Sequence, residues 1–191
     1  MNIKSWQRIQ FLPLALLGLM ALTRFDHFGS AFSLPDASLA VFFLAGLGIN
    51  RLWFFTVLLL EAGLIDYLAI TQFNVSDYCI SPAYGFLIPA YAVLWFTGVF
   101  SKRFVSLSIG NTIKMVGLIA LATTSAFVIS NGSFYLLSDK IVAISLLQFT
   151  SQFSHYYPPY LISTLCYGLA ALLVTKLIKS LLDTTITRTT T

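Results

Sequence analysis

The sequence predicts an all-α membrane protein, built as one bundle of six transmembrane helices. The chain of 191 residues is 58% hydrophobic and only 9% charged, and its mean hydropathy is +0.85. A soluble domain has about 45–50% apolar residues, so this composition excludes an ordinary soluble protein. Long apolar stretches recur over the whole length, and about six spans of roughly 20 residues fill the chain with short loops. We therefore expect a single domain over residues 1–191.

The first apolar segment follows basic residues, as the core of a signal peptide does. Arg24, Asp26 and His27 separate this segment from the small-x-small site at Ala31 and Ser33 where cleavage would fall, so we expect a retained helix. The complete set of predicted spans is Ile9–Thr23, Ser38–Ile49, Leu52–Gln72, Ala83–Phe100, Thr112–Ser130 and Pro159–Ile178.

Two of the segments that connect these spans have a predicted structure. The pair Asn50-Arg51 divides an apolar stretch too long for one helix, which predicts a tight hairpin after a short second span. Between the fifth and sixth spans, Ser138 is a candidate N-cap, and apolar residues follow it at roughly helical spacing. We expect a separate interfacial helix over residues 138–153, ahead of the pair Pro158-Pro159.

The basic residues predict the orientation, because cytoplasmic loops collect Lys and Arg. With the N-terminus inside, nine basic residues fall on the inner side and two, Arg24 and Lys140, on the outer side. We therefore expect a multi-pass membrane protein with both termini in the cytoplasm. The absence of a basic patch with interleaved aromatic residues argues against a nucleic-acid partner and leaves the lipid bilayer as the main one.

Cys79 is the most informative single residue, because it lies in a short polar break between two apolar spans. The other cysteine, Cys166, is about seven residues into the last span, hence roughly 10 Å deep, which disfavours a disulfide between them. The remaining interpretations are an inert thiol, a nucleophile and a metal ligand. Asp77 is an anion and would not depress the pKa of the thiol, so the local sequence favours the metal ligand.

A structural zinc site needs four Cys or His ligands at tight spacing, and the sequence has no such motif. A single thiolate is sufficient when the metal arrives in an organic ring that supplies most of its ligands, as in haem or cobalamin. His27, Tyr78 and Tyr84 are expected on the same side of the membrane as Cys79. His155 falls there too, with less indication of a role.

Two carboxyl groups, Asp66 and Glu61, lie within the third predicted span. An ionisable group at membrane depth is costly and marks a functional site by default. Asp66 is nearer the outer end and is interpreted as a ligand contact. Glu61, about 140° around the helix from Asp66, is interpreted as a neutral or paired structural group.

The order of Asp66, then Asp77-Tyr78-Cys79, then Pro82-x-Tyr84 in a six-span chain resembles the BtuM-type cobalamin transporters. These are small proteins of the bacterial inner membrane, solitary relatives of the substrate-binding S-components of energy-coupling factor (ECF) vitamin transporters, so the resemblance implies that location here. The resemblance implies an S-component-like six-helix fold that takes up cobalamin (vitamin B12) from the periplasmic side. It implies Cys79 as the axial ligand of cobalt, with Asp66, Tyr84, His27 and Tyr78 around the corrin. Catalysis at Cys79 would be limited to ligand exchange, including displacement of cyanide.

S-components that dock on the shared ATPase module often carry small residues four apart in the first helix. Here Ala15, Gly18 and Ala21 are spaced by three, which disfavours docking on an ECF ATPase module and favours a solitary protein. The main alternative is an exosortase-like membrane cysteine transpeptidase, using Cys79, Arg24 and a histidine. A haem or quinone redox protein and a purely structural subunit are further alternatives.

Overall fold

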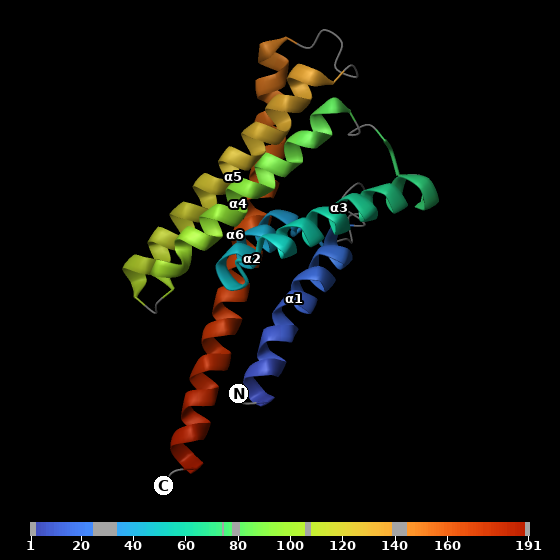
Figure 1. The fold of residues 1–191 in the computed structure, drawn as a ribbon. Coiled ribbons are helices and arrows are strands. Elements are labelled where there is room, and N and C mark those ends of the chain that lie inside the picture. The colour runs from blue at the N-terminus through green and yellow to red at the C-terminus, as the bar shows by residue number, and fades with distance from the viewer. Residues whose placement is uncertain are drawn as a thin grey trace.

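The computed structural model describes residues 3–24, 34–73, 75–77, 81–105, 108–138 and 145–189, and all regular structure in these ranges is helical (Figure 1). Two short 3-10 helices, η1 and η2, lie at the two ends of α4. The elements are α1 (Ile3–Arg24), α2 (Ser38–Gly48), α3 (Leu52–Phe73), η1 (Pro82–Phe86), α4 (Leu87–Ser101), η2 (Lys102–Phe104), α5 (Ile109–Leu137) and α6 (Leu146–Thr189). The predicted all-α class is therefore confirmed for the described residues.

Four helical segments among the described residues are long and apolar enough to cross a membrane. They are Leu52–Phe73, Pro82–Phe104, Ile109–Leu137 and Leu147–Val174. The apolar part of α1, Phe11–Arg24, and the whole of α2 are shorter. The protein thus has the helical membrane character that the composition predicts, with four helices of full spanning length.

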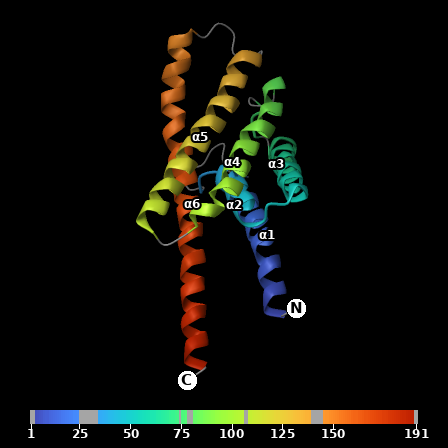
Figure 2. The ribbon, with the colours of Figure 1, turned by 60° about the vertical axis from the view of Figure 1, so that its left-hand side comes forward.

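The helices pack around α2, which contacts α1, α3, α4 and α6. Eight of the eleven residues of α2 are buried, so this short helix is the core of the molecule. In both views α4 and α5 lie side by side and run in opposite directions (Figures 1 and 2), and in Figure 1 the axis of α3 is steeply inclined to both. The N-terminus and the C-terminus lie toward the same end of the molecule (Figure 2).

Two glycines allow α2 and α4 to approach each other closely. A Cβ atom on Gly98 of α4 would collide with the carbonyl oxygen of Phe43 on α2, and one on Gly46 of α2 would collide with the carbonyl oxygen of Trp95 on α4. Small residues at such crossings let helix backbones meet, which is how helices associate in lipid. The α2–α4 contact is therefore a backbone-to-backbone contact made from both sides.

The structure differs from the prediction between the fifth and sixth spans. No separate interfacial helix over 138–153 is present in the described part of that stretch, because residues from Leu146 onward already belong to α6. That helix continues through Pro158 and Pro159, although prolines remove backbone donors and usually end a helix. The predicted boundary at Pro159 is thus wrong.

Packing against α5 explains why the helix continues past the prolines. The ring of Phe127 on α5 makes edge-on contacts with Phe153 before the proline pair and with Tyr160 after it. The hydroxyl of Tyr157 is 2.7 Å from the hydroxyl of Thr124, also on α5. These contacts hold both sides of the proline pair to one partner helix, and interrupted membrane helices are tolerated where neighbours support them.

We expect Gly98→Ala to destabilise the protein by about 1–3 kcal/mol, because the new methyl group overpacks the α2–α4 contact. The control is Gly117→Ala on α5, where a Cβ would meet nothing within 4 Å. At such a position alanine is favoured over glycine in a helix by about 0.5–1 kcal/mol. Thermal unfolding of both variants in the same detergent measures the difference. Equal melting temperatures would contradict the proposed close contact.

Candidate functional site

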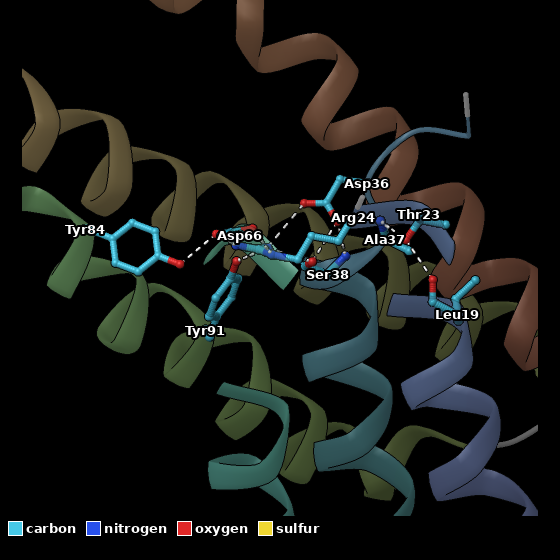
Figure 3. Close-up of polar contacts among 9 residues, drawn as sticks. All are labelled: Leu19, Thr23, Arg24, Asp36, Ala37, Ser38, Asp66, Tyr84 and Tyr91. Atoms are coloured by element: carbon cyan, nitrogen blue, oxygen red, sulfur yellow. Dashed lines mark hydrogen bonds and ion pairs between the residues drawn. The ribbon is translucent and has the colours of Figure 1, made fainter. Parts of the chain in front are cut away.

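A buried ion pair between Arg24 and Asp66 is the centre of the candidate site (Figure 3). Arg24 Nε donates to Asp66 Oδ1 over 2.8 Å, and Arg24 Nη2 donates to Asp66 Oδ2 over 2.6 Å. The two residues are 4% and 6% exposed. Parallel bonds of this kind match the fork of the guanidinium to both carboxylate oxygens and are among the strongest hydrogen bonds in proteins. The pair joins the last residue of α1 to the middle of α3.

The third nitrogen of the guanidinium connects the pair to α2 and α4. Arg24 Nη1 donates to Ser38 Oγ over 2.9 Å and to the hydroxyl of Tyr91 over 2.7 Å. The carboxylate of Asp36 lies 3.8 Å from the same nitrogen. Asp36 Oδ1 also accepts hydrogen bonds from the backbone N–H and the hydroxyl of Ser38, which starts α2.

Tyr84 extends this network to η1. Its hydroxyl donates to Asp66 Oδ2 over 2.6 Å, and its side chain is half-buried (Figure 3). Locally, Ser81 Oγ accepts from the N–H of Ala83, and Pro82 occupies the first helical turn where its missing N–H costs nothing. This capped turn is what directs Tyr84 toward α3.

The location of each charge follows from the helix ends. Arg24 is at the C-terminus of α1, where a cation is favoured by the helix dipole, and Asp36 precedes the N-terminus of α2, where an anion is favoured. Thr23 ties the same two ends together, because its hydroxyl oxygen accepts from the N–H of Ala37 over 3.1 Å. The network therefore lies between the end of α1 and the start of α2, and α3 and α4 contribute Asp66 and Tyr91 to it.

Of the predicted site residues, the structure brings Asp66 and Tyr84 into direct contact. Cys79, Tyr78 and His27 lie outside the described residues. His155 is exposed on α6 and lines a surface hollow of about 480 Å³ with Ser151, Ser154 and Tyr156, none of which belongs to the network.

The other carboxyl group of α3, Glu61, lies apart from the network. Glu61 lies about 1.4 turns before Asp66 on α3, and its Oε2 is buried without a hydrogen-bond partner in the described part of the chain. No group of three or more His, Cys, Asp or Glu side chains in that part could hold a metal ion.

Sequence reasoning missed two members of the network, Arg24 and Tyr91. Arg24 was assigned to the aqueous outer side, whereas the structure buries it in the network. The signal that points to it is the cost of an unpaired carboxylate at membrane depth, which requires a cation nearby. Tyr91 follows Tyr84 by seven residues, a spacing that returns to within about 20° of the same helix face. That spacing is the signal that could have found it.

Comparison with known proteins gives no family assignment: no family model matches the chain, and no curated protein is significantly similar to it in sequence. The class of protein therefore rests on the fold and the site. The chain is a helical protein of membrane character with a buried Arg–Asp pair whose hydrogen bonds join four helices and a 3-10 turn.

Removing one partner of the ion pair should destabilise the protein by about 3–5 kcal/mol, because an uncompensated charge stays buried. We expect this for Arg24→Met and for Asp66→Leu separately. In the double variant both charges are gone, so the loss should be much smaller than the sum of the two. Thermal or denaturant unfolding of the four proteins in detergent gives the coupling energy. Additive losses would show that the pair contributes nothing as a pair.

Proposed function

We propose that this protein takes up cobalamin across a bacterial inner membrane as a solitary, S-component-like transporter. The vitamin would bind at the outer mouth of the bundle with the thiolate of Cys79 as the axial ligand of cobalt. Asp66, Tyr84, His27 and Tyr78 would surround the corrin ring. The proposal starts from the resemblance of these residues and their order to BtuM-type transporters.

The single observation that carries the proposal is the hydrogen bond between Tyr84 and Asp66. These residues are eighteen positions apart and belong to two different elements, on either side of the chain segment that contains Cys79. Their contact holds η1 beside Asp66 on α3. Only two residues separate Cys79 from Pro82, the first residue of η1. This supports a site to which residues 66, 79 and 84 contribute together.

The direction of that hydrogen bond also supports the choice of ligand. A phenol has one proton, and Tyr84 gives it to Asp66 Oδ2, so toward a ligand its oxygen is left as an acceptor. The periphery of a corrin carries primary amides, whose N–H groups are donors. Asp66 then acts as a positioning residue that fixes the Tyr84 hydroxyl, and the half-buried Tyr84 ring makes the contact.

We further propose six spans with both termini in the cytoplasm. Four helical segments have spanning length, and the count is completed by α1, whose apolar part is Phe11–Arg24, and by the short helix α2. A helix of eleven residues is about 16 Å long, so α2 cannot cross a hydrocarbon core of about 30 Å unaided. Its burial among other helices satisfies the condition under which short or broken segments occur at membrane depth. Because Arg24 is buried in an ion pair, the outer side would then have one basic residue in place of two.

Binding of cyanocobalamin would include a ligand exchange at cobalt. The Cys79 thiol would lose its proton and form the sulfur–cobalt bond, while the cobalt–cyanide bond breaks with its electron pair and the cyanide leaves with the proton. Cobalt keeps its oxidation state, so no reductant is required. The chemistry of the site would be this displacement, and transport would need a later opening toward the cytoplasm.

The alternative, an exosortase-like transpeptidase, requires the Arg24 guanidinium to contact the substrate. In the structure its three nitrogens bond to Asp66, Ser38 and Tyr91, and the residue is 4% exposed. This arrangement favours the transporter, in which Arg24 holds the site together and touches no substrate.

Cobalamin added to the purified protein should change its absorption spectrum as sulfur replaces the upper ligand, and Cys79→Ala should abolish that change. Cys166→Ala is the matched control, because Cys166 is an exposed thiol on α6 and should leave the spectral change intact. Melting temperatures show whether each variant folds. A spectrum that does not change with the wild-type protein, or that changes equally with Cys79→Ala, would end the thiolate proposal.

In the Cys166→Ala background, a membrane-impermeant maleimide should label Cys79 in intact cells that hold no bound vitamin, because the proposed topology puts this thiol outside. Pre-incubation with cobalamin should protect it. The control is a cysteine introduced at the exposed Arg51, in the α2–α3 turn, which should react only after the cells are opened. The opposite labelling pattern would reverse the proposed orientation.

A further inference from the structure

A groove of about 350 Å³ lies at the end of α4 that is opposite η1. Its walls come from the η2 turn, the start of α5 and the middle of α6, and they are mainly apolar, with Asn111 and Thr112 as the polar members. The lining residues are Phe104, Val105, Asn111, Thr112, Met115, Leu169, Leu172 and Leu173. Met115 is buried at 3% exposure, whereas Leu173 is exposed, so the groove leads from the core to the surface of α6.

Two cations flank the aromatic ring that forms one wall of this groove. Lys114 Nζ is 5.5 Å from the centre of the Phe104 ring, and the guanidinium carbon of Arg103 is 5.9 Å from the same centre. Arg103 also stacks 3.8 Å over Phe100, and its Nε donates to the Phe100 carbonyl oxygen. Both cations are exposed, and among the described side chains neither forms an ion pair with a carboxylate.

The surroundings of the groove indicate what kind of molecule fits it. The adjoining face of α5 exposes Ile109 and Ile113, at 79% and 66%, and α6 exposes Leu173 and Val174. Such surfaces on helices of spanning length belong to the lipid-covered part of the protein. The groove therefore opens beside an exposed apolar surface of α5 and α6, and the cations Arg103 and Lys114 lie next to the Phe104 wall. A ligand must be apolar with an anionic head to match both.

We propose that this groove binds one anionic phospholipid, with an acyl chain along Met115, Leu169 and Leu172 and the phosphate between Arg103 and Lys114. Basic pockets between membrane helices bind anionic head groups in this way, and each nearby cation adds attraction. The phenyl rings of Phe100 and Phe104 keep the Arg103 side chain at the rim. The lipid would support the α4–α5 turn from the membrane side.

This proposal does not depend on cobalamin. The fifteen residues of α4 separate the groove from the Asp66–Tyr84 contact by about 22 Å along the helix. Failure of either proposal therefore leaves the other standing. The phospholipid proposal depends only on the protein being embedded in a membrane, which the four helices of spanning length support.

The test is native mass spectrometry of the full chain, purified in detergent and given equal amounts of phosphatidylglycerol and phosphatidylcholine with the same acyl chains. The wild-type protein should retain one phosphatidylglycerol in preference to phosphatidylcholine. The double variant Arg103→Gln, Lys114→Gln should lose this preference by about fivefold per cation, on the order of 25-fold for the pair. Arg51→Gln, which removes an exposed charge from the α2–α3 turn, should keep the full preference.

A second pair of variants tests the acyl-chain part of the groove. Leu173→Trp should fill the groove and reduce retention of the lipid, whereas Val174→Trp, on the neighbouring exposed position of α6, should not. Inorganic phosphate in excess should fail to displace the lipid. Equal retention of both lipids by the wild-type protein, equal losses in the paired variants, or displacement by phosphate alone would each overturn the proposal.

Discussion

The Arg24–Asp66 ion pair is the interaction on which the arrangement of the other helices depends. An isolated charge away from water is strongly unfavourable, so each partner requires the other. Because Arg24 is the last residue of α1 and Asp66 lies in α3, the pair fixes the end of one helix to the middle of another. The remaining donors of Arg24 then orient α2 through Ser38 and α4 through Tyr91.

The close α2–α4 contact brings Tyr91 to that pair. Gly46 and Gly98 let the two backbones touch. One turn before Gly46 on α2, and two turns before Gly98 on α4, the ring of Phe42 stacks on that of Tyr91 with ring centres 4.2 Å apart. A larger residue at either glycine would push α4 away and withdraw the Tyr91 hydroxyl from Arg24. The apolar packing and the polar network therefore depend on each other, because the α2–α4 backbone contact sets the position of the Tyr91–Arg24 hydrogen bond.

The sequence predicted where α2, α3 and α4 begin and end, because the apolar residues of each helix are consecutive in the chain. The apolar stretches of α2, α3 and α4 start and stop within a few residues of the predicted spans, and Asp66 stands out as a carboxyl at membrane depth. Its partner did not stand out, since Arg24 is forty-two residues away and only the folded chain brings them together. The same limit applies to α6, where prolines indicate a boundary locally and the contacts of Phe127 on α5 override it.

The network has more carboxylates than cations, and this imbalance explains which carboxylate binds Arg24. Arg24 is one cation facing two carboxylates, and it bonds to Asp66 while Asp36 stays 3.8 Å away. Asp66 is deeply buried and takes the guanidinium fork, whereas Asp36 has a side chain that is 22% exposed and accepts the N–H of Ser38 at the start of α2. Helix dipole and water thus compensate the second carboxylate. The guanidinium fork therefore binds the more deeply buried of the two carboxylates, and the Tyr84 hydroxyl is a further donor to that carboxylate.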